Sequence, residues 1–157
     1  MSDAPDVFVI ENAKLRYLNF SGAEINDYNA LGDRNFCVEL SPEMAEELSD
    51  DGWRVKYTKP DKDGNQIPYL KVKINYSYPK YRPIVYMKCG SNDWVELTEN
   101  RLNILDTAII VNVDVEFRKH VYNSRGDISA KLTRMFVTIR EDKLTEKYGN
   151  VLYNTES

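Results

Sequence analysis

Histidine and cysteine are scarce in this chain of 157 residues, which has one histidine, His120, and two cysteines, Cys37 and Cys89. A structural zinc site takes four ligands, mostly Cys and His, and these three residues fall short of that set. The chain opens on polar residues instead of a secretion signal, so we expect both cysteines to be reduced thiols. No metal or other cofactor is expected.

Long apolar runs and the glycine motifs of nucleotide-dependent enzymes are also missing. No segment approaches the roughly 18 apolar residues that a membrane-spanning helix needs. The chain has no P-loop, no dinucleotide-binding fingerprint and no nucleophile elbow. These absences predict a cytoplasmic protein that neither enters a membrane nor catalyses a reaction. A metal-dependent nuclease, built from acidic residues far apart in the sequence, stays an open alternative.

Positive charge is in deficit overall but is concentrated in one segment. The chain has 21 Lys and Arg against 25 Asp and Glu, for a net charge of −4. Residues 53–88 contain nine cations and two anions, a net charge of +7, which leaves −11 for the rest of the chain. A basic region on an acidic body suits a polyanionic ligand.

Alternation of apolar and polar residues indicates β-strands along most of the chain. Residues 35–40 show the period-two pattern of a half-buried strand. Ser41 and Pro42 predict the start of a helix that ends near residues 50–52, and shorter helical segments are expected near 99–105 and 141–148. The expected strands cover residues 7–20, 35–40, 53–58, 69–77, 84–89, 94–97, 108–117 and 129–139.

Most of these strands follow one another through links of hairpin length, which predicts a mainly antiparallel sheet. The predicted fold is mainly β: an oligonucleotide-binding (OB)-like, partly open antiparallel barrel with two or three short helices. We expect a single nucleic-acid-binding domain over residues 1–148 and a polar C-terminal tail over residues 149–157.

Tyrosines and cations are interleaved within the basic segment, where six of the eleven tyrosines lie. In residues 69–75 the strand period assigns Leu70, Val72 and Ile74 to the core. It leaves a second set exposed, which consists of Tyr69, Lys71, Lys73 and Asn75. Unpaired bases stack on aromatic faces while Lys and Arg follow the phosphates, so this face suits a single-stranded nucleic acid of any sequence. A purely structural interpretation also stays open, because half-buried tyrosines are common on sheets.

A loop with two prolines follows at residues 78–83. Pro79 and Pro83 exclude this loop from the interior of a sheet, since each removes a backbone donor. Tyr78 and Tyr81 have no evident core to pack into, and we expect them to be exposed for stacking.

The candidate nucleic-acid contacts come from this segment, from the first two strands and from a later hairpin. The complete set is Arg16, Tyr17, Phe20, Arg34, Lys56, Tyr57, Tyr69, Lys71, Lys73, Tyr76, Tyr78, Lys80, Tyr81, Arg82, Lys88, Arg118, Tyr122 and Arg125. A weaker basic set around the same hairpin adds Lys119, His120, Lys131 and Arg134. No catalytic or metal-binding residue is expected.

Several segments together resemble a family of small phage-encoded single-stranded-DNA-binding proteins. They are AKLRYLNFSG (13–22), DRNFCVEL (33–40), DGWRVK (51–56), PYLKVKINY (68–76), RPIVYM (82–87), LDTAIIVNVDVEFR (105–118) and KLTRMFVTIREDKLTEKY (131–148). The resemblance implies an OB-type fold and non-enzymatic support of phage DNA replication or recombination in the cytoplasm of a bacterial host. It also implies an aromatic cluster after Arg118, where this chain has residues 119–123, KHVYN.

Residues and resemblance together predict a sequence-tolerant single-stranded-DNA-binding protein. Phage or host replication and recombination proteins are the expected further partners, and RNA in place of DNA and a homodimer are both left open. The alternative is a protein–protein adaptor or inhibitor, for example of a host defence system. It would use the same aromatic and basic surface as interface anchors.

Overall fold

Nine strands form one sheet, and short helical segments complete the described chain. The computed structural model describes residues 6–22, 33–77, 80, 82–90 and 93–140. The strands are β1 (Val7–Ile10), β2 (Leu15–Asn19), β3 (Arg34–Glu39), β4 (Lys56–Tyr57), β5 (Pro68–Ile74), β6 (Ile84–Cys89), β7 (Val95–Leu97), β8 (Ile110–Val121) and β9 (Ile128–Ile139). The helical segments are α1 (Pro42–Asp50), η2 (Glu99–Arg101) and α2 (Ile104–Thr107).

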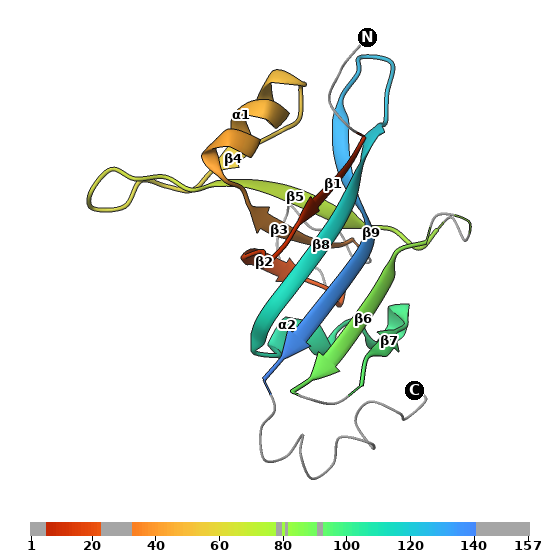
Figure 1. Ribbon diagram of the computed structural model, residues 1–157. Coiled ribbons are helices and arrows are strands. Elements are labelled where there is room, and N and C mark those ends of the chain that lie inside the picture. The colour runs from red at the N-terminus through yellow and green to blue at the C-terminus, as the bar shows by residue number, and fades with distance from the viewer. Residues whose placement is uncertain (1–5, 23–32, 78–79, 81, 91–92, 141–157) are drawn as a thin grey trace.

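The strand order is that of a barrel in which the first two strands of the chain, β1 and β2, lie at the two ends of the sheet. The main path runs β1–β8–β9–β5–β3–β2, and β6 also lies beside β9. Neighbours are antiparallel except for the β5–β9 and β6–β9 pairs, which are parallel. The path begins and ends with β1 and β2, which are consecutive in the chain (Figure 1). Because β1 and β2 do not pair with each other in the described sheet, the barrel is partly open, and the predicted OB-like class is confirmed.

A short break divides the N-terminal segment that we expected to form one strand over residues 7–20. Asn12 adopts a left-handed backbone conformation with φ of 51°, and its N–H donates to Asp114 Oδ1 at 3.0 Å. The Ala13 N–H still donates to the Val113 carbonyl of β8 at 2.8 Å, and the chain then pairs with β3 as β2. The single-strand prediction was therefore wrong, since one straight strand cannot pair with both ends of the barrel.

Side chains on the inner faces of the strands fill the barrel. In β5 the side chains of Leu70, Val72 and Ile74 are buried, as the alternation predicted. At one end Phe8 packs edge-on against Trp53, with the ring centroids 5.4 Å apart. Figure 1 shows α1 near this end of the sheet and α2 near the other, and each helix contributes buried side chains to the same core.

Helix α1 begins where the sequence predicted. The Ser41 hydroxyl accepts a hydrogen bond from the Met44 N–H at 3.2 Å, and Pro42 occupies the first turn. Ala45 and Leu48 are the buried residues of this helix. Neither α-helix of the described chain has the length and apolar character needed to pass through a bilayer.

Several predicted boundaries needed correction. Strand β4 covers only two residues of the predicted 53–58, because Trp53 turns into the core. Strand β8 extends four residues beyond the predicted end at Phe117. The pattern of residues 35–40 predicted a half-buried strand, but Asn35 and Cys37 on the second face of β3 are buried as well, since β3 is an interior strand between β2 and β5. The helix predicted over residues 141–148 lies outside the described residues.

Asp106 on α2 fixes the end of β2 from 85 residues away. Its two carboxylate oxygens accept hydrogen bonds from the N–H groups of Phe20 and Ser21, at 2.7 and 2.9 Å. Replacing Asp106 by Ala leaves both donors without this acceptor, and Phe20 is fully buried. We expect Asp106→Ala to lower the free energy of unfolding by about 1–3 kcal/mol in urea denaturation.

Asp61→Ala is the matched control for this prediction. Asp61 Oδ1 also accepts two backbone N–H bonds, from Asp63 and Asn65, but in an exposed hairpin loop. Water can replace an acceptor there, so this variant should lose much less stability. Equal losses for the two variants would contradict the structural role of Asp106.

Candidate nucleic-acid interface

A row of cations crosses the outer face of the sheet where β5, β9 and β8 lie side by side. Lys73 on β5 is the register partner of Lys131 on β9, and Lys131 is the partner of Arg118 on β8. Strand alternation puts all three side chains on the face opposite the core. Asn35 on β3 continues the row on the other side of Lys73.

A second, parallel row lies one pleat further along the same face. Cys37 on β3 pairs in register with Lys71 on β5, and His120 on β8 pairs with Ser129 on β9. Lys71 and Ser129 each come one residue before the paired Val72 and Ala130 of the parallel β5–β9 register, and both line the same cleft. Burial raises the pKa of Cys37 to about 11, so this residue contributes a neutral thiol under Lys71.

Aromatic rings flank the two rows. The Lys73 ammonium lies 5.7 Å from the centroid of the Tyr122 ring, which is within the range of a cation–π contact. Tyr17 and Tyr69 form a tilted pair with centroids 5.4 Å apart on β2 and β5. Tyr17 is 60% exposed and has a φ of 53°, a left-handed conformation at the irregularity in the β2–β3 ladder. Such irregularities re-aim side chains, and here the ring of Tyr17 projects from the outer face.

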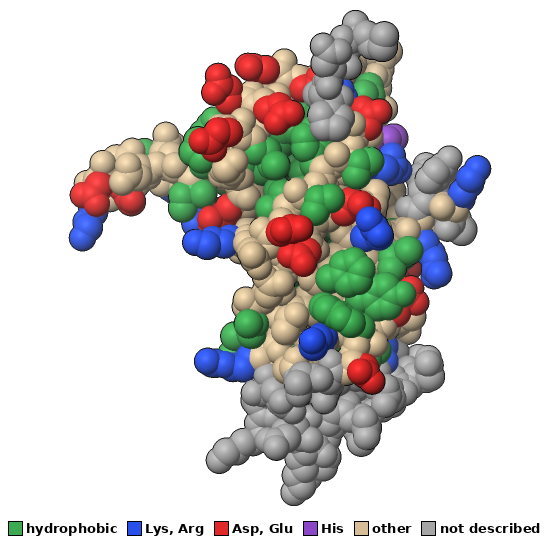
Figure 2. Space-filling model, viewed as in Figure 1, with side chains coloured by type: hydrophobic (Ala, Val, Ile, Leu, Met, Phe, Trp, Pro, Cys, Tyr) green, Lys and Arg blue, Asp and Glu red, His purple; other side chains and the backbone are tan. Residues whose placement is uncertain are grey.

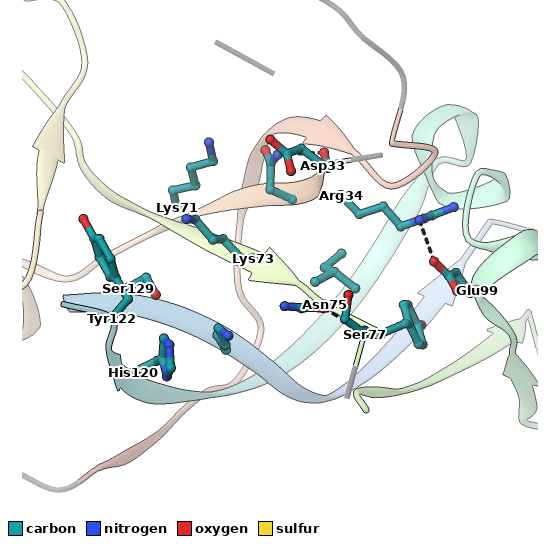
Figure 3. A pocket seen from close by; sticks show the side chains of 14 residues that line it. Asp33, Arg34, Lys71, Lys73, Asn75, Ser77, Glu99, His120, Tyr122 and Ser129 are labelled. Carbon is teal, nitrogen blue, oxygen red and sulfur yellow. Dashed lines mark hydrogen bonds and ion pairs between the residues drawn. The ribbon is translucent and has the colours of Figure 1, made fainter. Parts of the chain in front are cut away.

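Most residues of the two rows line a cleft of about 680 Å³, which we call the basic groove; Arg118 and Cys37 are next to residues that line it but do not line it themselves. Its walls come from β3, β5, the segment after β5 and the β8–β9 hairpin. Figure 3 shows Lys71, Tyr122 and Ser129 toward one end and Glu99 toward the other. A smaller hollow of about 190 Å³ shares Lys71, Lys73, Tyr122 and Ser129 with the groove, and Arg54 and Lys56 extend it toward β4.

Cations crowd one another in the groove. Burial lowers the pKa of Lys131, and the positive charges of Arg118 and Lys73 lower it further. The pKa of His120 is lowered first by burial and then by Lys131, Arg118 and Lys73. Neighbouring like charges of this kind are relieved when an anion binds among them.

The other end of the groove has a different chemistry. Arg34 Nη1 donates to Glu99 Oε2 at 2.8 Å, and the Arg34 and Glu99 side chains are 20% and 48% exposed. The Arg34 Nε and the Tyr76 hydroxyl are buried here without a hydrogen-bond partner among the described residues. Burial, with a contribution from Glu99, raises the pKa of Tyr76 to about 12, so its hydroxyl is neutral.

The groove brings together five of the predicted contact residues, while several others lie near its edges. Arg34, Lys71, Lys73, Tyr76 and Tyr122 line the groove itself. The residues near its edges are Arg16, Tyr17, Lys56, Tyr69 and Arg118. Among these, Arg16 is held by Glu39 at 2.7 Å. Their roles as contacts stay predictions.

Other predicted contacts are not among the residues that line the groove. Phe20 is fully buried and stacks on Phe36 in the core, which corrects its assignment to the accessible surface. Tyr57 is 53% exposed but faces a hollow beside α1. Arg125 pairs with Asp127 at 3.1 Å in the turn between β8 and β9. Lys80 and Arg82 are exposed, and Tyr78 and Tyr81 lie outside the described residues.

Lys88 belongs to a separate aromatic patch, which we define by Tyr86, Lys88, Trp94 and Phe136. Tyr86 and Phe136 stack with centroids 5.5 Å apart, and Trp94 meets Phe136 edge-on at 5.6 Å. The Lys88 ammonium lies 5.6 Å from the Trp94 ring. Figure 2 shows apolar side chains gathered over β6 and β9, whereas acidic side chains gather over α1.

Two residues that line the groove were not in the main set of predicted contacts. Lys131 and His120 belonged to the basic set around the hairpin, yet both line the groove. Their alternation with buried residues of β8 and β9 is the sequence signal for an outer-face position. Two members of the same set are engaged elsewhere: Lys119 pairs with Asp51 at 2.9 Å and Arg134 with Glu116 at 2.7 Å.

Across the described ranges, His, Cys, Asp and Glu side chains do not gather in a group of three that could hold a metal ion. Cys37 and Cys89 are both buried, and neither forms a disulfide within the part of the chain that the structure describes.

The strand order and the basic groove on β3, β5 and the β8–β9 hairpin define an OB-type oligonucleotide-binding domain. The chain belongs to a family of phage single-stranded-DNA-binding domains. The family model, described as "Putative phage ssDNA-binding domain", matches residues 3–157. No curated protein matches the chain.

Among solved structures, the chain is similar to the single-stranded DNA-binding protein from bacteriophage Enc34. The structure in complex with ssDNA has 12% identity and a TM-score of 0.48, and the match covers 87% of this chain and 88% of that chain. A second structure of that protein has 12% identity and a TM-score of 0.47, covering 91% of this chain and 90% of that chain.

Anion binding in the groove should be linked to protonation of His120. A phosphate among Lys131, Arg118 and Lys73 cancels their repulsion and raises the pKa of His120 in the complex above its lowered value in the free protein. A ligand that raises a pKa binds more tightly as the pH falls through it. Affinity for oligo(dT) is therefore expected to increase between about pH 7.5 and pH 5.5.

His120→Gln tests the origin of this dependence, because glutamine keeps a polar side chain that does not titrate. The affinity of the variant for oligo(dT), measured by fluorescence anisotropy, should change less with pH than that of the unmodified protein. The same pH dependence in both proteins would show that His120 is not the linked group.

Proposed function

We propose that this chain binds single-stranded DNA along the basic groove with little sequence preference over most of its length. The observation that carries the proposal is the cation row of Lys73, Lys131 and Arg118. A phosphate backbone that follows this row would gain ion contacts from three strands. Lysine contributes most of the charge as a point cation without bidentate geometry, which favours backbone contacts over base readout.

The rings beside the row favour a single strand over a duplex. Tyr122 is 44% exposed and lies over the Lys73 ammonium, while Tyr17 and Tyr69 form the second aromatic surface. Bases can stack on such rings only when they are unpaired, and stacking contributes about 1–3 kcal/mol per base. The OB fold uses this same face and the same hairpin loop for oligonucleotides.

In the infected cell, this activity would protect single strands during phage DNA replication or recombination in the bacterial cytoplasm. Family membership supports that setting. We further propose that the protein acts without catalysis, as one domain over residues 1–148 followed by a polar tail.

A protein partner is the second candidate function. The aromatic patch over β6 and β9 favours this function. Tyr86 and Phe136 stack on each other, and Trp94 beside them is 44% exposed, so the patch presents an apolar surface. Aromatic clusters of this kind anchor protein interfaces. A partner captured after complete nuclease digestion, and lost on Trp94→Ala, would support this function.

Tyr122→Ala and Tyr57→Ala form a matched pair that tests the proposed site. Both rings are about half exposed, but Tyr122 lies in the groove and Tyr57 faces the hollow beside α1. We expect Tyr122→Ala to weaken oligo(dT) binding about 5- to 100-fold, the equivalent of one stacked base. Tyr57→Ala should bind as the unmodified protein does.

Fluorescence anisotropy of labelled oligo(dT) at low salt measures both variants. Absence of binding by the unmodified protein would refute the proposed function. Normal binding by Tyr122→Ala, with circular dichroism showing an intact fold, would instead move the site away from the groove.

A further inference from the structure

The end of the basic groove at Arg34 and Glu99 is unsuited to phosphate. Glu99 presents a carboxylate that is half exposed, and Asp33, beside Arg34 in the chain, also lines the cleft. Figure 3 shows Glu99 at the opposite end of the cleft from Lys71, His120 and Tyr122. A DNA backbone that follows the cation row is repelled by this carboxylate, so the group that reaches Glu99 should be a base.

Glu99 is held in place before any ligand arrives. It is the first residue of η2, and its Oε2 accepts a hydrogen bond from Arg34 Nη1 at 2.8 Å. Arg34 is largely buried at the start of β3, so it anchors the carboxylate to the sheet. The second oxygen, Oε1, keeps its acceptor capacity, because this ion pair uses Oε2.

Hydrogen-bonding capacity is unused beneath this carboxylate. The Arg34 Nε and the Tyr76 hydroxyl are buried and have no partner among the described residues. Buried polar groups without partners are uncommon and cost about 1–3 kcal/mol each. Both residues line the cleft and lie near Glu99, which indicates a place where a ligand group or a water molecule completes the network.

We propose that Glu99, positioned by Arg34, forms a base pocket that prefers guanine at this end of the groove. A carboxylate only accepts hydrogen bonds, and guanine alone among the four bases has two adjacent donors, N1–H and the 2-amino group, on its Watson–Crick edge. Its neighbouring O6 is an acceptor, which suits donors such as Arg34 and the Tyr76 hydroxyl. This inference rests on the proposed function, and it adds one position of base selectivity to an otherwise tolerant track.

The test compares oligo(dT) with the same oligonucleotide carrying one central dG or one central deoxyinosine. Deoxyinosine keeps N1–H and O6 but lacks the 2-amino group. We expect the dG oligonucleotide to bind about 5- to 10-fold more tightly than oligo(dT), at the low end of a bidentate base contact. Deoxyinosine should lose most of that gain.

Glu99→Gln should abolish the preference for guanine, because an amide also donates hydrogen bonds and no longer selects a base edge with two donors. The variant should bind oligo(dT) slightly more tightly, because the negative charge that repels phosphate is gone. The matched control is Glu46→Gln, which removes one negative charge on the exposed face of α1, outside the groove. This control should keep the dG preference of the unmodified protein.

The outcomes separate the two proposals. If none of the oligonucleotides binds, the proposed function fails. If all bind with equal affinity to the unmodified protein, single-strand binding stands and the guanine pocket is refuted. A dG preference that persists in Glu99→Gln would also refute it, and the deoxyinosine comparison needs no variant, so it holds even if Glu99→Gln folds poorly.

Discussion

The parallel pairing of β5 with β9 is the contact on which both the barrel and the groove depend. It joins the strands of the N-terminal half to the β8–β9 hairpin, and it sets Val72 beside Ala130 and Lys73 beside Lys131. Val72 and Ala130 are buried in the core, while the two lysines lie on the outer face. A shift of one residue would exchange the two faces, so the same register that packs the core also builds the cation row.

This arrangement brings cations together at a cost to the free protein. Lys73, Lys131 and Arg118 repel one another, and together with burial, which is the larger cause, they lower the pKa of His120. The fold tolerates the repulsion because the opposite faces of the same strands are packed in the barrel. An anionic strand relieves the repulsion when it binds, so part of the binding free energy comes from charges already held in position. Acidic residues elsewhere, including those over α1 in Figure 2, keep the net charge at −4 without entering this row.

Much of the local structure could be predicted from the sequence because it depends on neighbouring residues. The alternation in β5, the Ser41 cap of α1 and the strand at residues 84–89 were confirmed. The break at Asn12 could not be predicted, because it follows from pairing with strands that come much later in the chain. Residues 53–88, with their net charge of +7, likewise do not form one surface, because pairing with distant strands separates them.

The sequence predicted the chemical character of the candidate site but not the full set of residues that form it. The outer face of β5 was confirmed as exposed or half-buried, with Lys71 and Lys73 in the groove. Lys131 joins them only through a parallel pairing between residues 58 positions apart, which leaves no periodic signal in the sequence. Phe20 was predicted to stack on bases, yet tertiary packing places it in the core, where it stacks on Phe36.

The salt dependence of oligo(dT) binding tests the central claim most directly. Each cation that contacts a phosphate contributes about 0.7 to the slope of log affinity against log salt concentration for a single strand. Replacing both Lys73 and Lys131 by Ala should therefore reduce the slope by about 1.4, whereas Lys14→Ala, on the exposed link between β1 and β2, should leave it unchanged. An unchanged slope for the double variant, or an equal reduction for Lys14→Ala, would contradict the account.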